Sequence, residues 1–192
     1  MRENYDTNLC GIDEAGRGPF AGPLSVAGVV LLENIEGLND SKKLTEKKRE
    51  KLFDSILENS LNHIVFTSPQ EIDRLGLSKC LQNSIQEIMK AIKAKQYLMD
   101  GNTAFGIQNL DFLIKADAKI EEVSAASILA KVSRDRYMCE IANKYPEYGF
   151  EKHKGYGTKI HTDAIMKYGY CDLHRRTFKI KKLEGLDILN NL

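Results

Sequence analysis

The most constraining feature of the sequence is an acidic pair that separates two apolar segments. Residues 9–12 are short and apolar, as in a buried strand, and residues 24–32 form a long apolar run, rich in valine, that predicts a central buried strand. Asp13 and Glu14 follow the first segment directly. Because side chains alternate between the faces of a strand, these two carboxylates can serve one site only where the strand ends and a turn redirects the second.

The turn that follows is Gly16-Arg17-Gly18, with Pro19 behind it. Glycine tolerates positive φ and leaves room for another backbone to approach, so Gly16 and Gly18 allow a sharp change of direction. An acidic pair at a strand end is most often a solvated turn. An arginine between glycines beside that pair favours instead a site that binds an anion next to a metal.

The composition is that of an ordinary globular protein, with 42% hydrophobic and 29% charged residues in a chain of 192, enough for one domain with a substantial core. No segment approaches the ~18–20 apolar residues of a membrane span. Residues 1–6 contain no apolar signal core, so we expect a cytoplasmic protein. The four cysteines form no CxxC pair and the four histidines no HExxH motif, which argues against a zinc site.

The net charge of +1 hides a strongly basic segment. Residues 152–182 contain nine Lys or Arg against two acids, a charge of +7 that leaves −6 for the remainder of the chain. Such a segment is most often a solvated face. Here it is interleaved with Tyr156, Tyr168, Tyr170 and Phe178, and basic residues mixed with aromatic ones are typical of a surface that binds nucleic acid.

The rest of the chain alternates between the patterns of strands and helices. Apolar runs predict further strands at 63–67, 97–99 and 112–115. Apolar residues at helical spacing predict helices at 45–57, 77–92, 123–145 and 162–168, the first of them capped by Thr45. This order predicts an α/β layered fold. We expect one domain over 1–145 and a basic helical extension over 146–192 that packs on the same domain.

Carboxylates mark the ends of three predicted strands: Asp13 with Glu14, then Asp100, then Asp117. Each aspartate alone is more often a turn former, because Asp is a favoured loop residue. Functional groups gather at strand ends in open α/β sheets, however, and all three aspartates follow apolar strands. We therefore expect them to form one site. Glu121 and Glu122 lie close to Asp117 in the sequence, and either could assist there.

Six motifs, taken in order, resemble the type 2 ribonucleases H, and specifically the ribonuclease HII family of bacteria. They span nearly the whole chain, and six in order are far more specific than any one of them. The motifs are Gly11-Ile12-Asp13-Glu14-Ala15-Gly16-Arg17-Gly18-Pro19 with Ala21-Gly22-Pro23, Asn39-Asp40-Ser41-Lys42-Lys43-Leu44, Met99-Asp100-Gly101-Asn102, Ser124-Ala125-Ala126-Ser127-Ile128-Leu129-Ala130-Lys131-Val132-Ser133-Arg134-Asp135, His153-Lys154-Gly155-Tyr156-Gly157-Thr158 and His174-Arg175-Arg176-Thr177-Phe178. One departure is Lys115-Ala116-Asp117, where the family commonly has Lys-Gly-Asp.

The resemblance implies a ribonuclease H-like fold, with a central mixed five-stranded sheet flanked by helices and a small helical C-terminal extension. It implies a metal-dependent endoribonuclease that hydrolyses the RNA strand of RNA·DNA hybrids and cuts 5′ of single ribonucleotides in duplex DNA, leaving 5′-phosphate and 3′-hydroxyl ends. Asp13, Glu14, Asp100 and Asp117 would be its catalytic and metal-binding residues. Carboxylates without histidine or cysteine fit Mg²⁺ or Mn²⁺ better than zinc, and two such ions about 4 Å apart can clamp a phosphoryl displacement.

The resemblance also assigns substrate binding. Backbone groups of Gly16, Arg17 and Gly18 can reach the 2′-hydroxyl that distinguishes RNA from DNA. An aromatic ring at Tyr156, packed against the deoxyribose that follows, would be hindered by a 2′-hydroxyl there; Tyr156 could equally be a tyrosine that packs a loop. Further substrate contacts are expected at Lys42, Lys43, Asn102, Ser124, Lys131 and Arg134.

Two alternatives stay open at this point. Lys131 and Arg134 could pair with acids such as Asp135 or Glu122 rather than with phosphate. The chain could also be another two-metal nuclease of the same fold, or a catalytically inactive module that binds RNA·DNA hybrids. Four intact carboxylates argue against the inactive module, because a binder should lose repulsive acids next to phosphate.

The expected partners are RNA·DNA hybrids and duplex DNA that contains ribonucleotides, with no membrane and with a monomeric chain. The tail over 185–192 has apolar spacing that fits a docked helix, a docking strip or a partner-binding peptide. The docked helix is the commoner outcome. As a partner-binding peptide, the tail would contact a replication sliding clamp.

Overall fold

The computed structural model describes residues 8–38 and 44–179. Its centre is a five-stranded sheet in the order β3-β2-β1-β4-β5. The antiparallel neighbours are β1 (Leu9–Ala15), β2 (Leu24–Leu31) and β3 (Ser60–Thr67), and β4 (Gln96–Asp100) and β5 (Asp111–Leu113) extend the sheet in parallel from β1. The predicted mixed five-stranded sheet is confirmed.

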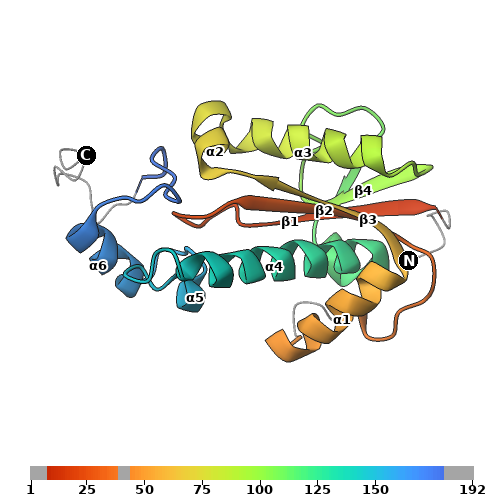
Figure 1. Cartoon of the computed structure of the whole chain (residues 1–192). Helices are drawn as coiled ribbons and strands as arrows, with labels where there is room; N and C mark the ends of the chain where they lie inside the picture. The colour runs from red at the N-terminus through yellow and green to blue at the C-terminus, as the bar shows by residue number, and fades with distance from the viewer. Residues whose placement is uncertain (1–7, 39–43, 180–192) are drawn as a thin grey trace.

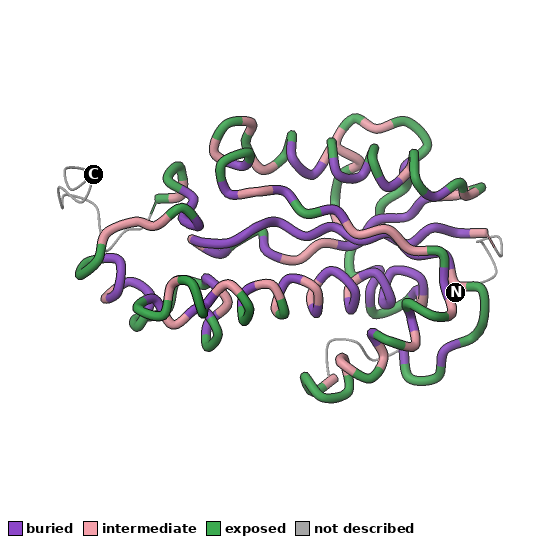
Figure 2. Tube along the Cα trace, viewed as in Figure 1, coloured by how far each residue is buried: buried purple, intermediate pink, exposed green. Residues whose placement is uncertain are grey.

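Helices cover both faces of this sheet (Figure 1). One face carries α2 (Pro69–Leu75) and α3 (Leu77–Ala91), and the other carries α1 (Glu46–Glu58) and the long α4 (Glu121–Ala142). The apolar stripe of α3 packs Leu81 and Ile85 against Val26 of the sheet. On the other face, Ala126 and its small neighbours let α4 approach closely. Figure 2 shows the result: the inner strands β1, β2 and β4 and the sheet-facing side of α4 are largely buried, whereas the edge strands β3 and β5 are more exposed.

The C-terminal helices α5 (Phe150–His153) and α6 (Lys159–Tyr168) lie beyond the end of α4 (Figure 1). They share an apolar cluster with Met138 of α4 and with Ala21, which belongs to the segment between β1 and β2. The segment between β1 and β2 is therefore packed against the C-terminal helices as well as against α4. The division of domains at 145 stays a prediction. Within the described residues, no helix has both the length and the apolar character to cross a membrane.

The structure corrects several predicted elements. β1 continues through Asp13 and Glu14, which pair opposite Ala27 and Val26, so the acidic pair lies within the strand rather than after it. Asp117 does not end a strand either, because β5 stops at Leu113 and Asp117 sits in the 3₁₀ turn η3 (Ala116–Ala118). The sequence does not predict the short helices α2 and α5. Lys42, Lys43 and the tail over 185–192 lie outside the described residues.

Candidate active site

Three carboxylates meet at the centre of the sheet. Asp13 comes from β1, Asp100 is the last residue of β4, and Asp117 comes from η3, directly before α4. One oxygen of each lies within 4.8 Å of the others, and Asp13 and Asp117 are buried. Over the described ranges this is the one group of three or more potential ligands that close together. We call it the carboxylate cluster.

Strand pairing explains why these residues meet. β1 and β4 are parallel with Ile12 opposite Met99, so the next residues, Asp13 and Asp100, are neighbours on the same face. The backbone N–H of Ala116 donates to Asp100 Oδ1 at 3.0 Å, which ties η3 to the end of β4. The left-handed residue at this turn is Lys115, with φ 59°, whereas Ala116 is fully buried. The alanine that departs from the family pattern therefore fills the core without needing glycine's conformation.

α4 closes the cluster from the face opposite α3. The approach depends on Gly11, where a Cβ would lie 2.3 Å from the backbone nitrogen of Val123. One turn further along α4, the Ser127 side chain hydrogen-bonds Asp13 and thereby lowers the pKa of that carboxyl. Burial acts more strongly in the other direction. Together with the charges of Glu14 and Asp100, it raises the pKa of Asp13 well above its ordinary value.

Glu14, the next residue of β1, lies outside the carboxylate cluster. The alternation of a regular strand points Glu14 away from Asp13, and it is absent from the three-carboxylate group. Its Oε1 accepts from Arg17 Nη1 at 3.2 Å, and its Oε2 is buried without a hydrogen-bond partner. Burial raises the pKa of Glu14, and Arg17 offsets part of that increase. The charge of Glu14 still acts on Asp13 and Asp100, so it lies within electrostatic reach of the cluster.

The donor set fits a hard divalent cation. All the grouped ligand atoms are carboxylate oxygens, and histidine and cysteine are absent from the group. The charges of Glu14 and Asp100 raise the pKa of Asp13, and the buried Glu14 Oε2 has no donor. A bound cation would relieve both conditions. The donor set therefore fits a divalent metal, and Asp13, Asp100 and Asp117 are the grouped residues that would hold it.

Residues 16–23, which we call the glycine turn, follow Asp13 and Glu14 in the chain. Gly16 has φ +96°, and a Cβ there would lie 2.3 Å from Arg134 Nε, so glycine is required both by conformation and by space. Arg17 and Gly18 are exposed. The exposed pair is thus presented to solvent directly beside the cluster, on a turn whose first residue is tightly packed.

Two buried arginines hold the glycine turn. Arg134 donates to the carbonyls of Pro23 at 2.8 Å, Ala21 at 3.0 Å and Lys154 at 2.9 Å. Arg175 donates to the Gly22 carbonyl through two nitrogens, at 3.0 and 2.8 Å, and to the Arg17 carbonyl at 3.2 Å. Each is 1% exposed. Burial lowers the pKa of both guanidinium groups, that of Arg175 to about 9.

The structure corrects two predicted substrate contacts. Arg134 is buried, and its hydrogen bonds go to backbone carbonyls rather than to the acids proposed as alternatives, which leaves it poorly placed to bind phosphate. Ser124 is also buried and donates its hydroxyl to the Leu38 carbonyl. The serine beside the cluster is Ser127, which the sequence analysis did not single out. The only available signal is spacing, because residues 124 and 127 share one side of a helix.

Lys131 and Tyr156 remain where a substrate can reach them. Lys131 pairs with Asp135 at 2.8 Å, as the alternative prediction allowed, and its side chain is 35% exposed. Its Nζ lies 6.0 Å from the centre of the Tyr156 ring, which is 44% exposed. Asn102, just beyond Asp100, is exposed. The exposed Tyr156 ring is not buried as a loop-packing tyrosine would be.

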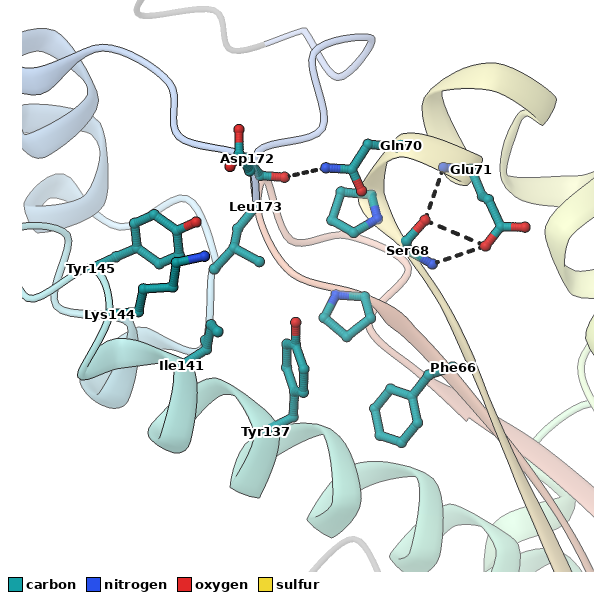
Figure 3. A pocket seen from close by; sticks show the side chains of 12 residues that line it. Phe66, Ser68, Gln70, Glu71, Tyr137, Ile141, Lys144, Tyr145, Asp172 and Leu173 are labelled. Carbon is teal, nitrogen blue, oxygen red and sulfur yellow. Dashed lines mark hydrogen bonds between the residues drawn. The ribbon is translucent and has the colours of Figure 1, made fainter.

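A pocket of about 350 Å³ lies elsewhere on the molecule, between α2, the C-terminal part of α4 and the segment near Asp172 (Figure 3). Phe66, Tyr137 and Leu173 give it an apolar lining. Tyr137 is ten residues beyond Ser127 on α4, roughly 15 Å along the helix. The carboxylate cluster is therefore separate from this pocket.

The fold and the cluster together define a class. A mixed five-stranded sheet that gathers carboxylates from two strands and from the approach to a long helix is the arrangement of the ribonuclease H-like nucleases. The family model for Ribonuclease HII matches residues 10–181. The chain belongs to the ribonuclease HII family. It is accordingly an enzyme, an endonuclease of the type 2 ribonuclease H class.

Individual relatives agree with this assignment. A ribonuclease HII of Aliarcobacter butzleri is 65% identical over 178 residues, which are 92% of this chain and 93% of that protein. The crystal structure of ribonuclease H2 from Pyrococcus horikoshii matches with a TM-score of 0.77 at 31% identity, covering 96% of this chain and 100% of the other. A ribonuclease HII solved in complex with PCNA, from Archaeoglobus fulgidus, matches with a TM-score of 0.77 at 28% identity, covering 91% and 96%.

Proposed function

We propose that this enzyme cuts 5′ of single ribonucleotides embedded in duplex DNA as well as hydrolysing the RNA strand of RNA·DNA hybrids, and that it leaves 5′-phosphate and 3′-hydroxyl ends. The reaction uses Mg²⁺ or Mn²⁺. Asp13, Asp100 and Asp117 would hold the metal, with Glu14, whose charge acts on Asp13 and Asp100, as a fourth ligand. Divalent metal bound there would lower the pKa of the attacking water and supply positive charge to the leaving 3′-oxygen.

The observation that carries this proposal is the line of polar groups along α4. Ser127 hydrogen-bonds Asp13, and Lys131 follows one helical turn later, about 6 Å along the axis. Lys131 in turn lies beside the Tyr156 ring. A nucleic acid strand whose scissile phosphate sits at the cluster would therefore pass a lysine and then an exposed aromatic ring, at roughly the spacing of neighbouring nucleotides.

Each group along this line has a separate task. Lys131 neutralises phosphate and positions the backbone without reading sequence. The exposed backbone of Arg17 and Gly18 meets the 2′-hydroxyl, and the Arg17 guanidinium, now paired with Glu14, is free to exchange that partner for phosphate. Tyr156 packs on the deoxyribose that follows the ribonucleotide, where a 2′-hydroxyl would hinder the ring.

A clamp contact is a second part of the proposal. The Archaeoglobus relative is described in complex with PCNA. We propose a corresponding sliding-clamp contact for this chain through its tail, residues 185–192. The monomeric state and the cytoplasmic location stay predictions.

The test compares three duplexes: one DNA duplex with a single ribonucleotide, one uniform RNA·DNA hybrid, and one of DNA alone. The expected result is cutting of the first two only, and only with Mg²⁺ or Mn²⁺ present. Tyr156→Ala should reduce cutting at the single ribonucleotide about tenfold more than cutting of the hybrid, the effect of one lost aromatic contact.

Tyr168→Ala is the matched control, since Tyr168 is 49% exposed and lies on α6. It should leave the ratio of the two activities unchanged. Equal losses on both substrates in Tyr156→Ala would contradict the role of Tyr156. Metal-independent cutting, or cutting of DNA alone, would contradict the mechanism itself.

A further inference from the structure

Three buried histidines gather around the segment that carries Tyr156. His153, His161 and His174 are 8%, 0% and 3% exposed, and the rings of His153 and His161 stack with centres 4.5 Å apart. They do not belong to the carboxylate cluster, and within the described part of the chain they form no group of potential metal ligands. Neither metal binding nor contact with substrate explains why three histidines are buried together.

Hydrogen bonds determine which ring nitrogen of each histidine carries the proton. The Cys171 backbone N–H lies 2.9 Å from His174 Nδ1, closer than the Cys171 carbonyl at 3.3 Å, so Nδ1 accepts and Nε2 carries the hydrogen. His174 Nε2 therefore donates to His161 Nε2, 3.1 Å away. His161 is then protonated on Nδ1, which donates to the Tyr156 carbonyl at 3.0 Å. The result is a directed chain from Cys171 to the backbone of Tyr156.

The third histidine completes the arrangement on the other side of Tyr156. His153 Nε2 donates to the Tyr148 carbonyl at 2.9 Å, and its Nδ1 accepts from the Gly155 backbone N–H at 3.2 Å. The Tyr156 backbone N–H donates to the His153 carbonyl at 2.9 Å. Both backbone polar groups of Tyr156 thus bond to a histidine residue, and the Tyr156 carbonyl accepts a second bond from the Thr158 backbone N–H at 2.8 Å, while Tyr156 itself stays exposed.

We propose that His161 and His174 are positioning residues that set the orientation of Tyr156 through its carbonyl, and that they thereby act on the choice between a single embedded ribonucleotide and a continuous hybrid. The proposal rests on the proposed function of Tyr156. Neither histidine touches substrate. They act by fixing the backbone from which the ring projects, and His161 does so only in the tautomer that His174 imposes.

The chemistry requires neutral rings. If His161 gained a proton, its Nε2–H would face the Nε2–H of His174 across 3.1 Å; if His174 gained one, its Nδ1–H would face the backbone N–H of Cys171 across 2.9 Å. Burial lowers the pKa of His161 to about 4 and that of His174 to about 3; the charge of His153 lowers both further, and that of His161 lowers the pKa of His174. Both rings are therefore neutral at neutral pH, as the chain of hydrogen bonds requires.

Two conservative substitutions at His161 separate the two bonds of that ring. In His161→Gln the side-chain amide reaches the position of Nε2, so the bond with His174 can be kept and the donor to the Tyr156 carbonyl is lost. In His161→Asn the amide reaches the position of Nδ1, so the donor to Tyr156 is kept and the bond with His174 is lost. His63→Gln is the control, because His63 is a partly exposed histidine on β3 that pairs with Glu87.

The activity readout is the ratio of cutting at a single ribonucleotide to cutting of the uniform hybrid. We expect His161→Gln to lower this ratio up to about tenfold, as one lost hydrogen bond allows. His161→Asn should lower it less, and His63→Gln not at all. Combined with Tyr156→Ala, His161→Gln should produce no further change in the ratio, because both act through one ring. Additive changes in the double variant would overturn the proposal.

A second readout does not depend on activity. Two-bond ¹H–¹⁵N spectra should show His174 protonated on Nε2 and His161 protonated on Nδ1, and His161→Gln should shift the Tyr156 resonances. Other tautomers, or unshifted Tyr156 resonances, would overturn the positioning whatever the activities are. If the resonances shift as expected while Tyr156→Ala leaves the ratio unchanged, the positioning stands and the proposed function of Tyr156 fails.

Discussion

The glycine turn begins three residues after Asp13 of the carboxylate cluster, yet different interactions hold the two regions in place. The cluster is built on regular structure, from two paired strands and the approach to α4, and its negative charges raise the pKa of Asp13. The glycine turn is irregular, and two buried cations, Arg134 and Arg175, donate to the carbonyls of the turn.

The difference shows how to interpret buried charge. Buried acids that crowd one another destabilise the fold until something positive binds, which marks a functional site. A buried guanidinium whose donors are directed at backbone carbonyls stabilises a shape and offers little to a ligand. Under the proposed function the first kind of charge supports chemistry and the second supports recognition, and substitutions should separate the two.

Asp13→Asn should have the largest effect on activity and the smallest cost in stability. Losing a metal ligand should reduce cleavage at least about 10³-fold. The metal-free variant should unfold at a higher temperature than the wild type, since a buried charge and its repulsion with Glu14 and Asp100 are removed. Thermal unfolding with and without Mg²⁺ checks this, because Mg²⁺ should stabilise the wild type more than the variant. A fully active variant would disprove the metal assignment.

Arg134→Met should have a large cost in stability and a smaller effect on activity. Three buried carbonyls lose their donor, so we expect the free energy of unfolding in urea to fall by about 4 kcal/mol. Lys131→Met is the comparison: stability should change by less than about 0.5 kcal/mol, while the slope of log affinity against log salt for hybrid binding falls by about 1. If Arg134→Met reduced the slope of log affinity against log salt without destabilising the protein, the prediction that Arg134 binds substrate phosphate would be supported.

The smallest effect should be the pH dependence of the segment beneath Tyr156. The pKa of His161 is about 4 in the folded protein against an ordinary 6.5, so the unfolded chain takes up a proton first as pH falls. Its contribution to stability is complete above pH 6.5 and is lost as pH falls towards 4. Between pH 7 and 5 the wild type should lose about 2 kcal/mol more than His161→Asn. Equal pH profiles for the two proteins would show that His161 is not buried in its neutral form.

Much of the fold follows from local pattern. The apolar run of β2, the Thr45 cap of α1 and the spacing of apolar residues in α3 are properties of short segments, and the structure confirms them. The sequence also predicted that Asp13, Asp100 and Asp117 lie together, and they do, although the reasoning from strand ends holds only for Asp100, because Asp13 lies within β1 and Asp117 in η3.

What the sequence could not supply depends on contacts between distant segments. The direction of Glu14 depends on β1 continuing to Ala15, which only pairing with β2 determines. Arg134 resembles any helical arginine until 21–23 and 154 are brought around it. Ser124 and Ser127 are equivalent in pattern, and only the placement of α4 against Gly11 separates them.

The bonds between the start and the end of the chain also set the order in which the two halves of the site can form during synthesis. The cluster needs nothing beyond α4. The glycine turn waits for the C-terminal segment, because Phe20 and Gly22 exchange backbone bonds with Gly155, Leu173 and Arg175. A growing chain should therefore acquire its acidic centre before the glycine turn has all of its bonds, and a protein truncated before residue 173 should retain the acids without the bonds that Leu173 and Arg175 make to the turn.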